Sequence, residues 1–230
     1  MLNKRIINTG GSGAACTTDT TQILDAGSTQ SLALYRFEDN ANDTAYAAGS
    51  IVSSNRELDL DANGYSGYGD WLDSSGNSRN GVINGATYVN NNNADYFTFD
   101  GSNDNIKISS SGLINSNGVN FSVETWAKNR SAGNNHVVTQ TSEDGNGQNW
   151  LLRFQSDNTI KFYVYGTDVY LGTSDTFSVG TWHHIVGVVE SDGTVRIYVN
   201  GVLKASSGSG KSADTLSYNT FIGSLGGQQY

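Results

Sequence analysis

The chain has 230 residues, of which 36% are hydrophobic and 15% charged, with 28 Gly, no Pro, one Cys and a formal net charge of −9. The longest apolar runs, such as residues 185–189, fall far short of the ~20 residues that cross a bilayer, so no membrane partner is expected. The 13 Lys and Arg are scattered singly apart from Lys4-Arg5, which disfavours nucleic acid as a partner.

Residues 1–30 are predicted to form an extended N-terminal arm. The stretch 8–21 consists almost entirely of Gly, Ser, Thr, Ala and Asp, which cannot build a core. Such an arm becomes ordered only against a partner, and the alternative is a disordered terminus. It lacks the apolar centre of a secretion signal, so Sec-type export is not expected. The lone Cys16 cannot form an internal disulfide.

The hydrophobic pattern takes a period of two from Ser31, which predicts a strand over 31–37. Similar segments follow at 86–89, 96–99, 106–108, 121–128, 137–140, 150–154, 159–165, 182–190, 194–199, 202–205 and 220–222. Asn200-Gly201 predicts a hairpin, because both central residues of a type I′ turn need positive φ. The meander over 181–205 and the many short strands favour an all-β sandwich of two packed antiparallel sheets.

The strand at 121–128 separates two kinds of side chain. Phe121, Val123, Thr125 and Ala127 share one side, and Ser122, Glu124, Trp126 and Lys128 share the other. A carboxylate therefore lies beside an indole. This face is either a partly covered sheet surface or a concave surface that holds a ligand or an ion.

Five motifs in order resemble laminin-G-like domains of the concanavalin A-like lectin/glucanase superfamily. They are SLALYRFEDNAND at 31–43, DSSGNSRNGVINGATY at 73–88, YFTFDGSNDNIKI at 96–108, FSVETWA at 121–127, and GTWHHIVGV at 180–188 with VNGVL at 199–203. The resemblance implies a jelly-roll sandwich over 31–230, with calcium and carbohydrate or protein ligands often bound at its rim. A polar arm before such a domain also resembles virion proteins of tailed bacteriophages.

Two departures from the family pattern matter. Residues 45–70 are a probable insertion, and the final strand expected after Phe221-Ile-Gly is missing. A missing strand would leave strand 31–37 with an unpaired edge. We predict that a neighbouring subunit, the N-terminal arm or residues 45–70 covers that edge.

The predicted insertion contains a candidate calcium loop. Its ligands occupy positions 1, 3, 5, 7 and 12 of a calcium-binding loop, the seventh through a backbone carbonyl. They are Asp59, Asp61, Asn63, Tyr65 and Asp70. Flanking helices are absent from the pattern, and an acidic solvated turn is the alternative.

The same segment permits a catalytic interpretation. Glu57, Asp59 and Asp61 alternate with leucines, as in the Glu-x-Asp-x-Glu device of family-16-like glucanases. Retaining hydrolysis needs two carboxyl groups about 5–5.5 Å apart. The third position is Asp rather than Glu and a flexible Ala-Asn-Gly follows, so we expect no catalytic residues and no enzyme activity.

A second calcium candidate follows from the resemblance. It consists of Asp73, Asn77, Asp100 and Asp104 on two loops. Hard oxygen ligands on adjacent loops suit calcium. The alternative is that Asp73 and Asp100 only cap turns through their side chains.

Aromatic residues offer the strongest ligand argument, because sugar rings stack on them through C–H faces. The candidate ligand-binding residues are Tyr65, Tyr68, Trp71, Trp150, Tyr163, Tyr165 and Tyr170.

The sequence as a whole favours a structural or attachment protein of a phage virion, of capsid-decoration or tail-fibre type. Residues 1–30 would contact other virion proteins, a homo-oligomer is possible, and the sandwich would bind host-surface glycans on the virion exterior. The alternative is a calcium-dependent carbohydrate-binding module of a secreted bacterial adhesin, which would be extracellular. A glycan hydrolase is the third interpretation.

Overall fold

The computed structural model describes residues 30–34, 56–91, 94–109, 118 and 120–227. Residues 1–29 of the arm predicted over 1–30, residues 35–37 of the predicted first strand and residues 45–55 of the predicted insertion lie outside them. Gln30, the last residue of the predicted arm, belongs to β1. The strands are β1 (Gln30–Leu34), β2 (Arg56–Leu60), β3 (Gly81–Asn84), β4 (Thr87–Val89), β5 (Tyr96–Thr98), β6 (Asn105–Ile108), β7 (Phe121–Lys128), β8 (Asn135–Thr141), β9 (Gln148–Phe154), β10 (Ile160–Val164), β11 (Val169–Gly172), β12 (Trp182–Val189), β13 (Val195–Val199), β14 (Val202–Ser206) and β15 (Asn219–Ile222).

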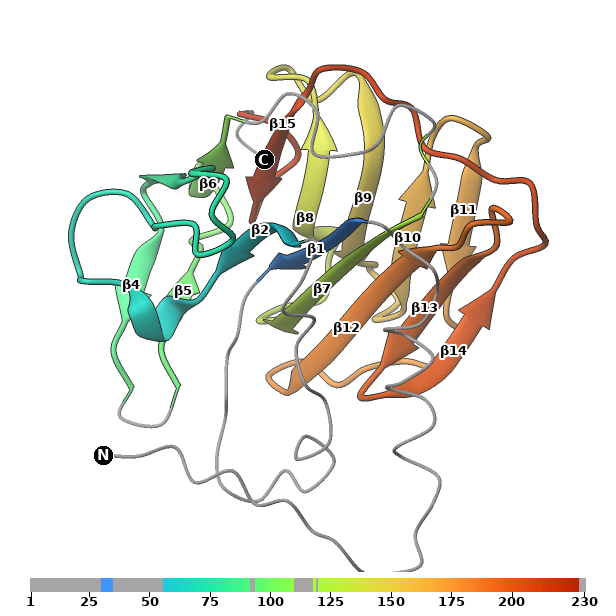
Figure 1. Ribbon diagram of the computed structural model, residues 1–230. Helices are drawn as coiled ribbons and strands as arrows, with labels where there is room; N and C mark the ends of the chain where they lie inside the picture. The colour runs from blue at the N-terminus through green and yellow to red at the C-terminus, as the bar shows by residue number, and fades with distance from the viewer. Residues whose placement is uncertain (1–29, 35–55, 92–93, 110–117, 119, 228–230) are drawn as a thin grey trace, which may run out of the picture.

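Two sheets pack face to face (Figure 1). The six-stranded sheet has the order β14-β13-β12-β7-β1-β2, and the seven-stranded sheet has the order β11-β10-β9-β8-β15-β6-β3. Strands β4 and β5 form a separate hairpin. The predicted all-β sandwich is therefore confirmed. Among the described residues, the one helix is the short 3-10 turn η2 (Ala62–Gly64). No helix in this part of the chain is long and apolar enough to cross a membrane.

One strand corrects the expectation that both sheets are antiparallel. β1 runs parallel to β7 and to β2, whereas every other pair in the two sheets is antiparallel among the described strands. Parallel neighbours need a crossover connection of about a dozen residues or more. Residues 35–55, which join β1 to β2, are long enough to make one.

β2 comes from the predicted insertion and lies at the edge of the six-stranded sheet. Its pairing with β1 confirms that residues within 45–70 cover the edge of the first strand. Leu58 and Leu60 are fully buried, while Glu57 and Asp59 face away from the core. This described part of the predicted insertion therefore contributes to the core.

The predicted meander is confirmed by the register of β12, β13 and β14. Asn200 and Gly201 have φ values of 51° and 76°, as a type I′ turn requires. The alternation along β7 also holds, because Val123 and Thr125 are fully buried toward the core. Glu124 on the opposite face contacts His184, with 2.7 Å between Oε1 and Nε2.

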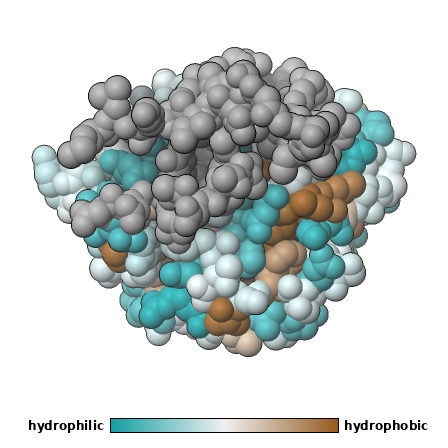
Figure 2. Space-filling view, turned by 90° about the horizontal axis from the view of Figure 1, so that it is seen from below, coloured by the Kyte–Doolittle hydropathy of each residue, from teal (hydrophilic) through white to brown (hydrophobic). Residues whose placement is uncertain are grey.

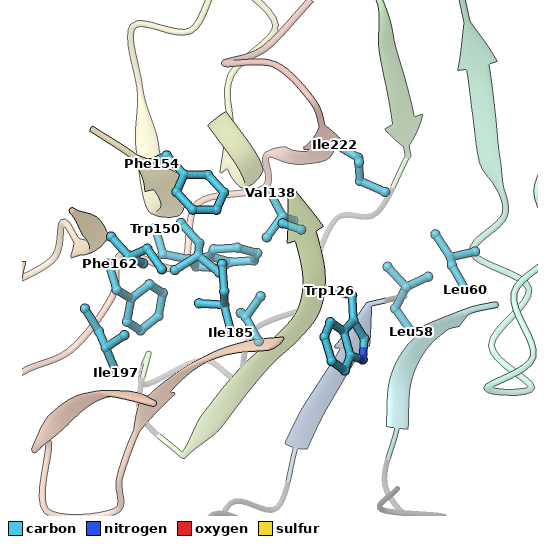
Figure 3. Close-up of a cluster of buried hydrophobic side chains, with 14 of the residues drawn as sticks. Leu58, Leu60, Trp126, Val138, Trp150, Phe154, Phe162, Ile185, Ile197 and Ile222 are labelled. Atoms are coloured by element: carbon cyan, nitrogen blue, oxygen red, sulfur yellow. The ribbon is translucent and has the colours of Figure 1, made fainter. Parts of the chain in front are cut away.

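A large aromatic and aliphatic cluster fills the space between the sheets (Figure 3). Trp150, Phe154 and Phe162 reach it from the seven-stranded sheet, and Ile185 and Ile197 reach it from the six-stranded sheet. Their exposures are 2% or less, so each contributes about 1.5–3 kcal/mol through burial. On the face seen in Figure 2, the apolar residues of the described chain are interspersed with hydrophilic ones.

Candidate functional site

A cleft of about 610 Å³ opens at the rim of the sandwich, and we call it the rim cleft. One wall is formed by β5 and the turn at 99–104, and another by the end of β7 and the loop at 129–135. Phe154 and Ile222 contribute to its lining from the seven-stranded sheet. Aromatic, amide, acidic and basic side chains therefore meet around one concave surface, which is the usual composition of a small-ligand site.

The acidic wall is a tightly bonded turn. Asp100 Oδ1 accepts the backbone N–H groups of Ser102 at 2.8 Å and Asn103 at 3.3 Å, and these bonds lower the pKa of Asp100. Asp104 Oδ2 accepts the N–H of Asp100 at 2.9 Å. Both carboxylates therefore shape the turn, and Asp100 is charged at neutral pH.

The amide wall contains one buried donor without a partner. Asn129 is 3% exposed, and its Oδ1 accepts Asn135 Nδ2 at 2.6 Å. Asn129 Nδ2 has no hydrogen-bond partner among the described residues. Leaving such a buried donor without an acceptor costs free energy.

Aromatic and basic groups meet at the other end of the cleft. The ring centres of Tyr96 and Trp182 are 5.4 Å apart in an edge-to-face arrangement. Lys128 Nζ lies 4.8 Å from the centre of the Trp182 ring and 5.6 Å from that of Tyr96. Trp182 and Lys128 are partners across the β7–β12 ladder, which explains why a lysine and an indole share this end.

His136 also lines the rim cleft. Burial, together with the nearby positive charge of Arg153, lowers the pKa of His136 to about 4. The imidazole is therefore neutral near pH 7.

The first predicted calcium set is engaged by protein groups. Asp59 forms an ion pair with Arg56, and burial raises the pKa of Asp59 while Arg56 opposes that rise. Asp61 caps η2 by accepting from the backbone and side chain of Asn63. The Tyr65 hydroxyl donates to Gly69 O, and Asp70 is exposed.

The second predicted calcium set is not gathered at one point. Asp73 accepts hydrogen bonds from Asp59 N, Ser75 N and Oγ, and Arg79 N. The Asn77 amide donates to the carbonyls of Arg56 and Glu57. Asp100 and Asp104, by contrast, line the rim cleft.

Within the described ranges, no three His, Cys, Asp or Glu side chains are arranged to hold a metal ion. Of the predicted calcium ligands, Asp61, Asp73 and Asp100 cap turns, and Asp59 pairs with Arg56. Calcium binding stays a prediction, which chelation would test.

Two of the three carboxylates of the catalytic interpretation, Glu57 and Asp59, each face an arginine, whereas Asp61 caps η2. Arg79 Nη1 lies 2.5 Å from Glu57 Oε2 and also donates to Glu57 O at 2.6 Å, and Asp59 pairs with Arg56. The strand does place Glu57 and Asp59 on one side, as the alternation predicts. Both groups are thus occupied by cations at the edge of the sheet.

The structure corrects two of the predicted aromatic platforms. Trp71 and Trp150 are 1% and 0% exposed, because both fill the core, and the Trp71 indole N–H donates to Asp61 O at 3.0 Å. Tyr65 packs against Tyr88 and Phe97 at ring distances of 5.0 and 5.2 Å. Tyr68 is 79% exposed.

The remaining three predicted aromatics do lie together on the seven-stranded sheet. Tyr170 is 5.0 Å from Tyr163 and 6.0 Å from Tyr165 between ring centres, and it is 59% exposed. The Arg153 guanidinium stacks 4.8 Å over Tyr163. We call Tyr163, Tyr165 and Tyr170 the tyrosine face. Tyr163 is 9% exposed, so the accessible part of this second candidate surface is Tyr165 and Tyr170, and it is not part of the rim cleft.

Sequence reasoning missed Tyr96, Asn129, Arg130 and Trp182 as site residues. The available signal was the alternation that placed Trp126 and Lys128 on one face of a strand. No spacing rule connects that strand to Tyr96, which is distant in sequence.

A rim cleft on a two-sheet jelly-roll sandwich defines a lectin-like all-β module. The family model of the concanavalin A-like lectin/glucanases superfamily matches residues 100–230, and the chain belongs to this family. A comparison with curated proteins returns no match.

Solved structures share the fold at low identity. The binding domain of Paraclostridial Mosquitocidal Protein 1 is 18% identical with a TM-score of 0.54, over 69% of this chain and 41% of that one. Domain 4 of AbnA, an extracellular arabinanase of Geobacillus stearothermophilus in complex with arabinotriose, is 19% identical with a TM-score of 0.52, over 67% of this chain and 78% of that one. The present chain thus spans less than half the length of the mosquitocidal structure.

Proposed function

We propose that this protein is a non-enzymatic glycan-binding module and that the rim cleft holds the sugar. The observation that carries the proposal is the meeting of the Tyr96 and Trp182 rings with amide and charged side chains around one concave surface. A domain of the same fold, from the Geobacillus arabinanase, has been solved with arabinotriose, which supports the fold as a carrier of sugars.

Stacking and hydrogen bonding have separate sources in the cleft. Tyr96 and Trp182 are both partly exposed, so their rings offer apolar surface to the C–H face of a pyranose or furanose. Asn129 Nδ2 offers a buried donor, and exposed Asn134 adds a second amide. The volume of about 610 Å³ lies in the ordinary range of small-ligand sites.

Hydrolysis is the weaker proposal. Glycosidases of the usual kind need one carboxylic acid and one carboxylate on either side of the scissile bond. In the rim cleft, the Asp100 and Asp104 oxygens accept backbone N–H groups of their own turn. We therefore propose binding without turnover.

The test is a glycan array followed by calorimetry on the full chain. Trp182→Ala and Tyr96→Ala should each weaken sugar binding by about tenfold or more, as loss of a stacking partner does. Tyr170→Ala is the matched control, because it removes an exposed aromatic from the tyrosine face. Sugar binding that is unchanged in both cleft variants and lost in Tyr170→Ala would move the site to the tyrosine face.

We further propose a virion surface as the place where the module acts. The polar arm at 1–30, the acidic composition and the resemblance to phage virion proteins support an attachment role, with other virion proteins as partners of the arm. The alternative is a calcium-dependent module of an extracellular bacterial adhesin. Light scattering with and without a chelator separates them: a calcium-independent trimer or larger assembly supports the virion role, and a monomer that loosens on chelation supports the adhesin.

A further inference from the structure

Two basic side chains of the rim cleft stand out in this acidic protein. Five other Lys and Arg residues have a carboxylate partner: Arg56, Arg79, Lys107, Arg196 and Lys204. Lys128 and Arg130 form no ion pair within the described part of the chain, and neither do Arg153, Lys161 and Lys211. What distinguishes Lys128 and Arg130 is that both line the same concave surface. In a chain with a net charge of −9, two adjacent basic groups without a carboxylate partner on one concave surface call for a physical reason.

The structure holds the positive charge of Lys128 in place. Its Nζ lies over the rings of Trp182 and Tyr96, at 4.8 and 5.6 Å from their centres. A cation–π contact fixes an ammonium group without neutralising its charge. Arg130, two residues further on, is exposed, so its planar guanidinium can reach a ligand.

A smaller hollow of about 420 Å³ lies at this basic end. It is lined by Tyr96, Thr98, Lys128, Arg130 and Gly180, and none of these residues is acidic. The hollow shares four of its residues with the rim cleft, so one ligand can occupy both. Gly180 has a φ of 82° and donates its N–H to Asn129 O at 2.7 Å, a left-handed conformation that glycine adopts without strain.

The rim cleft also contains acidic residues, which lie outside this hollow. They are Asp100 and Asp104, and Asp100 is held charged by the backbone N–H groups that it accepts. The imidazole of His136 is neutral near pH 7, so it adds no charge to the cleft. A negatively charged group of a ligand is therefore favoured in the hollow beside Lys128 and Arg130 and disfavoured beside Asp100.

We infer that the hollow lined by Lys128 and Arg130 is a subsite for the carboxylate of an acidic sugar residue. This inference rests on the proposed glycan-binding function and adds its substrate class, sugars of the uronic or sialic acid type. Arg130 can pair with the carboxylate through two parallel N–H···O bonds, and Lys128 adds a point charge. The Tyr96 and Trp182 rings would contact the apolar face of the same sugar.

The test uses ligand pairs that differ only in the carboxylate. Trigalacturonic acid is compared with its methyl ester, and 3′-sialyllactose with its methyl ester, by calorimetry on the full chain. We expect the acidic member of at least one pair to bind about tenfold more tightly, the gain typical of one charge-assisted hydrogen-bonding group. The preference should shrink as NaCl rises from about 0.05 M to about 0.5 M, because salt screens exposed charges.

Variants separate the subsite from general electrostatics. Arg130→Ala and Lys128→Met should abolish the preference for the acidic sugar, and Arg130→Lys should restore only part of it. Lys211→Ala makes the same change in net charge outside the rim cleft and should keep the preference. A preference that survives in the double variant Arg130→Ala/Lys128→Met would overturn the subsite.

Two further outcomes distinguish a failure of the carboxylate subsite from a failure of the proposed glycan-binding function. Equal affinity for the acidic and neutral members of both pairs would overturn the carboxylate subsite while leaving the glycan-binding function in place. A wild-type protein that binds no member of either pair, and nothing on the array, would overturn both. Binding of inorganic sulfate as tightly as the acidic sugars would also count against a carboxylate-sugar site, because it would show a general anion site.

Discussion

Gly223 lies so close to Phe99 that a Cβ atom on the glycine would stand 2.3 Å from Cδ1 of the ring. Gly223 also has a φ of 81° and donates its N–H to Val137 O at 3.0 Å. The segment that follows β15 therefore packs closely against Phe99, which lines the rim cleft.

Gly223→Ala should lower the free energy of unfolding by about 2–4 kcal/mol, since it combines left-handed backbone strain with overpacking against Phe99. Gly101→Ala is the matched control: its φ is 82°, and nothing lies within 4 Å of its added Cβ. The control should cost only about 1 kcal/mol. Urea unfolding of both variants gives the comparison, and equal losses would contradict the close packing.

Leu58→Ala should lower the free energy of unfolding by about 2–5 kcal/mol, because Leu58 is fully buried between the sheets. Leu72→Ala makes the same change at a side chain that is 65% exposed, and should stay within about 0.5 kcal/mol of wild type. Thermal or urea unfolding measures both. If Leu58→Ala lowered the free energy of unfolding as little as Leu72→Ala does, β2 would not contribute to the stability of the core.

The backbone amides of β1 at residues 32–34 should exchange slowly with deuterated water, because β1 lies between β7 and β2 in the six-stranded sheet. The edge strand β14 has a neighbour on one side only and serves as the comparison. Hydrogen exchange followed by mass spectrometry resolves the two strands. Exchange at 32–34 as fast as that of β14 would argue against the parallel placement of β1.

Stability should fall as the pH drops from about 6.5 toward about 4. The pKa of His136 is about 4 in the folded protein and 6.5 in the unfolded chain, so the unfolded state binds a proton first. Protonation of His136 lowers the free energy of unfolding by at most about 3 kcal/mol, and this loss is complete below pH 4. Burial also lowers the pKa of His183, which adds a loss of the same sign.

His136→Gln should flatten much of the pH dependence between pH 6.5 and 4, as measured by urea midpoints. The low pKa of Asp144, about 2, acts on stability mostly below about pH 4, where the unfolded carboxyl takes up its proton, so it adds little within this window. A wild-type profile that is flat from pH 7 to 4 would contradict the burial of His136.

The alternation of apolar residues predicted most of the strands, because short strands of period two leave a plain pattern. β7 and β12 to β14 are the clearest cases, since Asn200-Gly201 also identifies the turn between two of them. β2, β3 and β11 were missed. β2 lies in the segment predicted to be an insertion. β3 and β11 each have four residues with a glycine at one end, which is too short for a period to show.

The candidate site was harder to predict, because it depends on long-range packing. Tyr96 and Trp182 come from strands that are distant in sequence, and no local pattern brings their rings to 5.4 Å. Trp150 shows the opposite difficulty. A Trp within an apolar run looks the same in a sequence whether it forms an exposed ligand platform or lies in the core. Trp150 is fully buried.

The most direct test of the central claim is to map a bound oligosaccharide onto the protein by NMR, using isotope-labelled full chain and the tightest glycan from the array. We predict that the Trp182 indole signal and the amide signals of 128–135 shift on titration, with saturation at one site. The signals of Tyr163, Tyr165 and Tyr170 should not move. Shifts confined to that tyrosine face, with residues 128–135 unchanged, would contradict a glycan site in the rim cleft.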